Sequence, residues 1–156
     1  MASPPGTGDV STELNSMIDG WNAAMGLRFV RATADEVVVE WEVGAQHRQP
    51  YGIVHGGVHA GVIETIASVG AAIYAGPRGQ AVVGLENHTS FIHAVRDGVL
   101  RATARPLTRG RRTQVWEGDV RDAAGRIVAT GRVRLLCLEP GSDLAGAAVS
   151  AKPRLG

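Results

Sequence analysis

A long apolar segment, residues 56–76, most constrains what this 156-residue chain can fold into. Its larger side chains recur at the spacing of a buried helical stripe: Val58, Val62, Ile66, Val69 and Ile73. Most other positions are alanine or glycine, and each glycine inside a helix costs about 1 kcal/mol relative to alanine. We therefore expect a helix that is stable only where a fold packs closely around it, and that ends at Gly76-Pro77.

The same segment is long enough to span a membrane, but it contains a carboxylate. Glu64 is the only Asp, Glu, Lys or Arg between Arg48 and Arg78, and an acid at the bilayer centre costs roughly 2.5–3.5 kcal/mol on insertion scales. We expect a core helix and no membrane span. Burying an acid without a partner is unfavourable, so Glu64 is a candidate working group, with a solvated helix edge as the alternative.

On both sides of this helix the hydrophobic period becomes that of strands. Residues 27–32 and 36–43 predict a hairpin, and four more strands are predicted at 81–93, 99–107, 113–121 and 127–138. Before them, Ser11 or Thr12 could cap a short helix that ends near Gly26. The order is helix, two strands, long helix, four strands, which predicts an α+β fold with an antiparallel sheet and one central helix.

Length and composition predict one globular domain, since 44% of the residues are hydrophobic and 20% are charged. We expect this domain to span residues 11–139. The terminal segments 1–10 and 140–156 are rich in small residues and proline and are expected to be mobile.

The charge and cysteine content exclude several classes of partner. A net charge of +1 and an aromatic content of 4% argue against nucleic-acid binding. The single cysteine, Cys137, allows neither an internal disulfide nor a cysteine metal cluster. The N-terminus lacks the pattern of a secretory signal, so we expect a cytoplasmic protein. No metal is expected either. His55, His59 and Glu64 are the candidate ligands, but Glu64 follows His59 by five positions, so its side chain lies ~140° away around the helix axis.

Five segments resemble those of the hotdog-fold acyl-CoA thioesterases: GIVHGGV at 52–58, IETIAS at 63–68, VVGLENHT at 82–89, PLTRGRR at 106–112 and VATGRVRL at 128–135. The chain looks most like the branch with PaaI-like and Arthrobacter-type 4-hydroxybenzoyl-CoA thioesterases. The resemblance implies a hotdog fold, in which an antiparallel sheet wraps one long helix, and a homotetramer built from dimers. It also implies hydrolysis of acyl-CoA, with aromatic acyl groups suggested by the branch and no cofactor beyond the coenzyme A of the substrate.

The resemblance implies a catalytic set of four residues. Glu64 matches the acid that attacks the thioester or activates water, and Gly56 matches the donor of the backbone N–H that polarises the carbonyl. Gln49 matches the polar residue before the HGG turn, and Ser68 matches a hydroxyl one turn after the acid. The chemistry of the glycines agrees, because Gly56 and Gly57 open the helix, where free N–H groups and the positive end of the dipole suit an oxyanion.

Further residues are candidates for binding the substrate. Arg109, Arg111 and Arg112 cluster in one turn, and guanidinium groups suit the phosphates of coenzyme A; Thr113 adds a hydroxyl nearby. The alternative is a solvated hairpin tip. His55 and Gly57 are expected to border the substrate, with His55 more suited to capping the helix than to acting as a base.

Gly56 and Glu64 are eight residues apart, which is about 12 Å along a helix. One carbonyl cannot contact both, so we predict sites shared between two subunits and an inactive monomer.

Three alternative functions remain open: a hotdog dehydratase or hydratase, a non-catalytic acyl-CoA-binding module, and a structural oligomer in which Glu64 is incidental.

Overall fold

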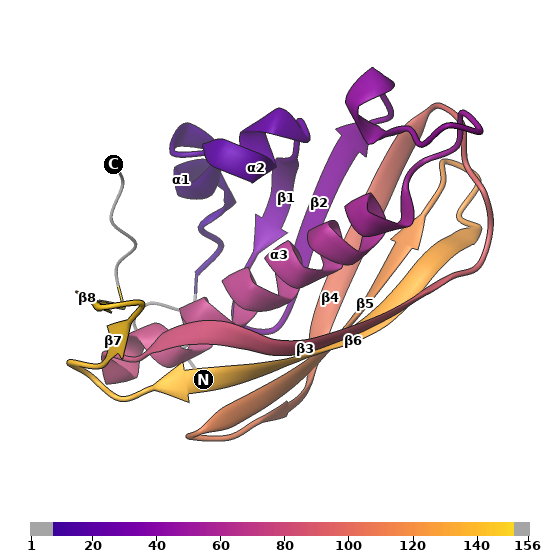
Figure 1. Cartoon of the computed structure of the whole chain (residues 1–156). Coiled ribbons are helices and arrows are strands. Elements are labelled where there is room, and N and C mark those ends of the chain that lie inside the picture. Colours follow the sequence, from indigo (N-terminus) through magenta and orange to yellow (C-terminus); the bar gives the residue numbers. More distant parts are fainter. Residues whose placement is uncertain (1–7, 152–156) are drawn as a thin grey trace.

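A computed structural model describes residues 8–151 and shows a curved antiparallel sheet wrapped around one long helix (Figure 1). The elements are, in chain order, α1 (Ser11–Ser16), α2 (Gly20–Ala24), β1 (Arg28–Ala32), β2 (Val37–Glu42), α3 (Gly56–Ala75), β3 (Ala81–Phe91), β4 (Val99–Arg109), β5 (Thr113–Arg121), β6 (Ile127–Leu138), β7 (Asp143–Leu144) and β8 (Ala147–Ala148). The predicted α+β class and its central helix are confirmed, and each predicted strand is present.

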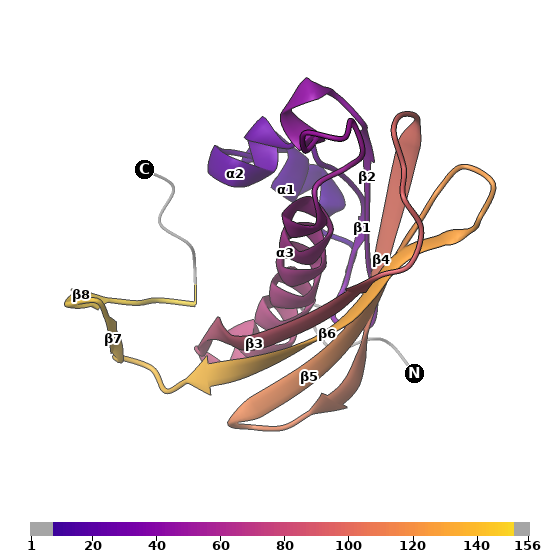
Figure 2. The same ribbon diagram turned by 45° about the vertical axis from the view of Figure 1, so that its right-hand side comes forward.

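The six long strands form one sheet in the order β1-β2-β4-β5-β6-β3, and all neighbouring pairs are antiparallel. Strand β3 follows α3 in the chain but lies at the far edge of the sheet, beside β6 (Figure 2). Helix α3 therefore crosses the inner face of the sheet on its way from β2 to β3. The outer edge of β3 has no strand partner among residues 8–151.

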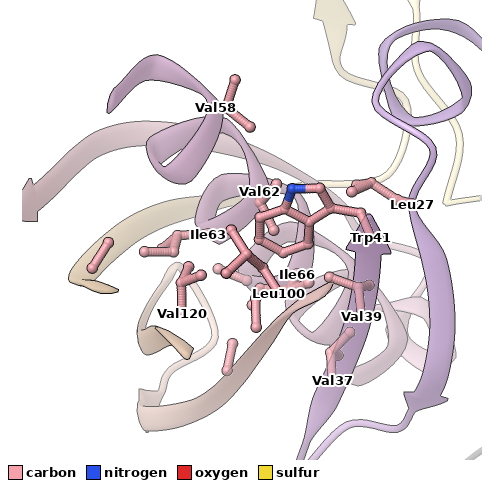
Figure 3. Close-up of a cluster of buried hydrophobic side chains, with 14 of the residues drawn as sticks. Leu27, Val37, Val39, Trp41, Val58, Val62, Ile63, Ile66, Leu100 and Val120 are labelled. Carbon is pink, nitrogen blue, oxygen red and sulfur yellow. The ribbon is translucent and has the colours of Figure 1, made fainter. Parts of the chain in front are cut away.

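The hydrophobic core lies between α3 and the inner face of the sheet. Val62 and Ile66 of the predicted stripe are fully buried, and Val58 is 8% exposed. Trp41 and Trp116 are buried as well. Figure 3 shows side chains of α3 meeting those of β2, β4 and β5. Each fully buried Val or Ile contributes about 1.5–3 kcal/mol, which offsets the glycine content of this helix.

By length and composition, the helical segment Gly56–Arg78 could cross a membrane, but half of its most apolar window is buried inside the protein. A core helix of this kind passes the same test. The burial agrees with the expectation, drawn from Glu64 and the flanking strands, that this segment belongs to a folded domain.

The N-terminal helix differs from the prediction. It is not one helix capped by Ser11 or Thr12, because α1 is preceded by Val10 at its cap position and a second helix, α2, starts at Gly20. The backbone of Gly20 has φ +55°, a conformation that interrupts a right-handed helix. Asp19 then caps α2 by accepting a hydrogen bond from the Gly20 N–H at 2.6 Å.

Both ends of the described chain make contacts with the rest of the fold or with themselves. The Val10 N–H donates to the Ala32 carbonyl at 2.9 Å, and Asp9 accepts from the Ala32 N–H at 2.9 Å. Strands β7 and β8 form a short hairpin in which Leu144 lies opposite Ala147. The predicted mobility of residues 1–7 and 152–156 lies outside the described residues.

Candidate active site

The start of α3 is shaped by His55, which is its N-cap. The His55 Nδ1 accepts a hydrogen bond from the Gly57 N–H at 2.8 Å, so the ring has the capping role expected from its place before two glycines. By contrast, the Gly56 N–H has no acceptor among the described residues. A free donor is thus left at the positive end of the helix dipole.

A pocket of about 460 Å³ opens beside this helix start. It brings together four of the residues predicted from the HGG turn, namely Gln49, His55, Gly56 and Gly57. The other walls are largely apolar and include Phe91. The Gln49 Oε1 accepts a hydrogen bond from the Tyr51 N–H, which ties the Gln49 side chain into the turn.

His59 also lines this pocket, although sequence reasoning considered this residue only as a metal ligand. Its side chain is 3% exposed, and its Nδ1 has no hydrogen-bond partner among the described residues. Burial lowers the pKa of His59 from 6.5 to about 4. The ring is therefore neutral at neutral pH and can accept or donate a hydrogen bond without carrying charge. No group of three or more His, Cys, Asp or Glu residues within 8–151 is placed to hold a metal ion.

Glu64 lies in a second pocket, of about 450 Å³, between α3 and β3. The carboxylate is only partly exposed, and its Oε2 accepts a hydrogen bond from the Asn87 Nδ2 at 3.1 Å. The remaining wall consists of uncharged residues. Glu64 is therefore a half-buried acid with one polar partner and open space beside it.

Asn87 connects the helix to the edge strand. Its Nδ2 also donates to the Ala60 carbonyl of α3 at 2.9 Å, and its Oδ1 accepts from the Thr89 Oγ1 at 2.6 Å. Neither Asn87 nor Thr89 was predicted as a site residue. Both are half-buried, whereas Glu86, His88 and Ser90 are exposed.

Gly84 on β3 makes room for the other carboxylate oxygen. A Cβ at this position would lie 2.3 Å from the Glu64 Oε1, which is closer than atoms can approach. The pairing of β3 with β6 is also irregular between Gly84 and Glu86. A glycine inside a strand often marks a bulge or a close approach, so the VVGLE segment held a signal that sequence reasoning did not use.

Within one chain, the free N–H of Gly56 and the carboxylate of Glu64 belong to different pockets, and Phe91 lines both. Ser68 follows Glu64 by one turn and is half-buried. It lines neither of these two pockets, and its hydroxyl makes no hydrogen bond with a described residue.

Arg109 is held by the protein itself. Its Nη1 donates to the Ala34 carbonyl and to the Asp35 Oδ1, each at 2.7 Å. Its guanidinium lies 4.7 Å from the centre of the Tyr74 ring. These contacts join the end of β4 to the β1–β2 turn and to α3, so Arg109 has a clear structural role.

The other members of the predicted arginine cluster face solvent. Arg111 makes a long ion pair with Glu139, at 3.6 Å, and such exposed pairs contribute little to stability. Arg112 is exposed, and its side chain has no partner among the described residues. Thr113 is exposed at the start of β5. Arg111, Arg112 and Thr113 are therefore accessible to a ligand.

With this geometry described, the chain can be compared with known proteins. The family model of the Thioesterase superfamily matches residues 51–129. Rv1847 of Mycobacterium tuberculosis, a protein classed with the esterases, is 38% identical over 121 residues, which cover 76% of this chain and 86% of that protein. The chain belongs to the Thioesterase superfamily. Its sheet around one central helix is the hotdog fold of that family.

Other known proteins are similarly close to this chain. The proofreading thioesterase EntH of Klebsiella pneumoniae is 36% identical over 111 residues, covering 71% of this chain and 80% of that protein. The crystal structure of AziG from S. sahachiroi has a TM-score of 0.75 and 45% identity, covering 78% of this chain and 98% of AziG. The structure of Rv1847 also has a TM-score of 0.75. The family and its thioesterase members assign a hydrolase acting on thioesters.

Proposed function

We propose that this superfamily member is a cytoplasmic acyl-CoA thioesterase that releases a free acid and coenzyme A without a cofactor. The observation that carries the proposal is the pair of half-sites on α3: a carboxylate with one free oxygen at Glu64, and an unpaired N–H at Gly56. A thioester carbonyl needs a nucleophile or base at its carbon and a donor at its oxygen. Glu64 supplies the first, by direct attack or through a water molecule, and Gly56 supplies the second.

Two chains are needed to complete each site. The unpaired edge of β3 carries exposed apolar side chains, Leu85 at 50% and Phe91 at 59%, and such edges are normally covered. Two β3 edges joined antiparallel would extend the sheet and place the two α3 helices antiparallel. Gly56 of each chain would then approach Glu64 of the other. Association of such dimers gives the proposed homotetramer.

The substrate proposal draws on both pockets and on the β4–β5 turn. The largely apolar wall around Gly56 suits an apolar acyl group, which we propose to be aromatic. Arg111, Arg112 and Thr113 are accessible and suit the phosphates of coenzyme A. Two structures of a Staphylococcus aureus protein, SAV0944, are each 25% identical to this chain. One carries alanine in place of a glutamate, and the other carries alanine in place of a glutamine. These two residues have the same separation as Gln49 and Glu64, which supports treating that pair as one unit.

The test is coenzyme A release from a panel of aryl and alkyl acyl-CoA esters by wild type and Glu64→Gln. We expect the variant to lose about 10²–10⁴-fold in kcat, the usual contribution of a positioned acid or base. Glu86→Gln is the matched control, because Glu86 is exposed on the neighbouring strand β3 and pairs with Arg134. Acyl-pantetheine esters with the same acyl groups test the nucleotide contact.

Each part of the proposed function is contradicted by a different outcome. Wild type that releases no thiol from any ester would contradict the thioesterase proposal. Equal hydrolysis by wild type and Glu64→Gln would contradict the role of Glu64. An equal KM for acyl-CoA and acyl-pantetheine would contradict the phosphate contact at the arginine turn.

A further inference from the structure

We propose that Asn87 and Thr89 are positioning residues that hold Glu64 by Oε2 and leave Oε1 as the reactive oxygen. This inference rests on the proposed function and extends it to two residues of the edge strand. Three hydrogen bonds define the arrangement: Asn87 Nδ2 to Glu64 Oε2 at 3.1 Å, Asn87 Nδ2 to Ala60 O at 2.9 Å, and Thr89 Oγ1 to Asn87 Oδ1 at 2.6 Å.

The surrounding groups determine which way the Asn87 amide points. A carbonyl oxygen and a carboxylate oxygen, both acceptors, face one end of the amide, and a hydroxyl faces the other. A flipped amide would set its oxygen against the two acceptors and lose both hydrogen bonds. The NH₂ group therefore faces Glu64, where it donates a charge-assisted hydrogen bond that favours the ionised carboxylate.

The two oxygens of Glu64 are thereby made unequal. Oε2 is bound by Asn87, while Oε1 lies beside the Cα of Gly84 and has no donor among the described residues. Apart from Glu64 itself, the pocket lining carries no titratable side chain: Ala60, Gly61, Asn87, Thr89 and Phe91. Asn87 is thus the residue of this lining that donates to the carboxylate, and Oε1 is the oxygen free to face a thioester or a water molecule.

The amide is held from two sides. Its contact with Ala60 fixes it to α3, one turn before Glu64, and the Thr89 hydroxyl fixes it to β3. Loss of the hydroxyl would leave the Asn87 Oδ1 without a donor and free the amide to rotate. Thr89 therefore acts on Glu64 through Asn87.

The first measurement is the pH dependence of kcat and KM for a set of variants. Asn87→Leu keeps the approximate size and removes the donor, and Thr89→Val keeps the shape and removes the hydroxyl. We expect Asn87→Leu to lower kcat about 100-fold, as a misplaced catalytic group does, with a much smaller effect on KM because Asn87 acts through the position of Glu64. Thr89→Val should lose less, and Thr89→Ser, which retains the hydroxyl, should recover wild-type kcat.

The acidic side of the pH profile separates positioning from general damage. Asn87→Asp is nearly isosteric but sets a second carboxylate against Glu64, and like charges disfavour ionisation. We expect activity in this variant to fall at a higher pH than in wild type. Ser90→Ala, at an exposed neighbour whose hydroxyl makes no hydrogen bond with a described residue, should leave the profile unchanged.

A second measurement does not depend on turnover. The ¹³C NMR signal of the Glu64 carboxyl, assigned by its absence in Glu64→Gln, is compared at pH 7 in wild type and in Asn87→Leu. We expect the chemical shift of this carboxyl to change when the hydrogen-bond donor is removed. An unchanged chemical shift would overturn the proposal.

The outcomes distinguish this inference from the proposed function. If Glu64→Gln is inactive while Asn87→Leu and Thr89→Val keep wild-type kcat and pH profile, the positioning proposal fails and the thioesterase stands. If hydrolysis survives Glu64→Gln, the role of Glu64 fails and the reactive role of Oε1 fails with it. The NMR comparison then still shows whether Asn87 holds the carboxylate.

Discussion

Gly84 determines how closely the carboxylate of Glu64 can approach strand β3. The missing side chain of this residue leaves space for Oε1, while Asn87 binds Oε2. The position is exposed, and the atom that a methyl group would meet is the far end of a flexible side chain. A substitution here should therefore disturb the site more than the fold.

Gly84→Ala should move Glu64 without removing it. We expect kcat to fall about 100-fold, because displacement of a catalytic group by about 1 Å has effects of that size, while the midpoint of thermal unfolding stays within a few degrees of wild type. Gly76→Ala is the matched control, since a Cβ there meets nothing within 4 Å. Full activity in Gly84→Ala would show that the carboxylate does not need this space.

His59 makes stability depend on pH. The folded state holds its pKa at about 4, below the ordinary 6.5, so between these values the unfolded chain takes up a proton that the folded chain does not. The free energy of unfolding should therefore decrease as the pH is lowered from 6.5 to about 4. This residue contributes at most about 1.4 kcal/mol per pH unit to the decrease. Above pH 6.5 the effect vanishes, because the ring is neutral in both states.

Urea unfolding of wild type and His59→Leu at pH 7, 6 and 5 tests this dependence. Leucine cannot take up a proton, so the variant should lose less stability between pH 7 and pH 5 than wild type does. Because other histidines also titrate, the difference between the two proteins is the informative quantity. Identical slopes would contradict a buried neutral His59.

At the scale of elements, two glycines of α3 lie under two tryptophans of very different freedom. A Cβ at Gly70 would lie 2.3 Å from Trp116, which is fully buried on β5. A Cβ at Gly61 would lie 2.6 Å from Trp21, which is 43% exposed on α2. The same helix therefore has one glycine that cannot be replaced without repacking and one that can.

Gly70→Ala should destabilise the protein by about 1–3 kcal/mol, the usual cost of overpacking a core. Gly61→Ala should be neutral or gain up to about 1 kcal/mol in helix propensity, because the indole of Trp21 can turn outward. Chemical denaturation of both variants against wild type measures the contrast. Equal destabilisation would mean that Trp21 is held as firmly as Trp116.

Local patterns in the sequence predicted the elements well where periodicity and turn residues agree. The helix from Gly56 and the strands around it follow from spacing alone, and His55 was expected to cap because it precedes two glycines. The N-terminal helix was predicted wrongly, because apolar spacing continues past Gly20 although the backbone of that glycine breaks the helix. The contact of Asn87 with Glu64 joins residues 23 positions apart, and no local pattern reports it.

At the scale of the whole molecule, one chain holds two halves of different proposed sites. The N–H of Gly56 can be removed by Gly56→Pro, because proline is well tolerated at the first position of a helix. His55 already has the extended conformation, φ −64° and ψ 132°, that a following proline requires. Phe91, which a side chain at position 56 would meet, is 59% exposed and can move.

Two inactive variants should therefore restore each other. A dimer formed from one Gly56→Pro chain and one Glu64→Gln chain would contain one doubly damaged site and one intact site. Refolding an equal mixture should recover about a quarter of wild-type activity, since half of randomly paired dimers are mixed and each has one working site. Each variant refolded alone is the control. No recovery in a mixture shown by mass spectrometry to contain mixed dimers would contradict shared sites.

Strand β3 has two structural roles. Its residues Asn87 and Thr89 lie toward the helix, and its outer edge has no strand partner among residues 8–151. In the proposed assembly, turnover per chain is set by concentration, because separated chains hold only half-sites and the rate at high dilution grows with the square of the amount of protein. A substitution that shifts the backbone of this strand then alters chemistry and association at the same time. Variation in β3 is accordingly constrained twice: a change that weakens association lowers turnover per chain only until the protein concentration is raised, whereas a change that misplaces Glu64 lowers it at every concentration.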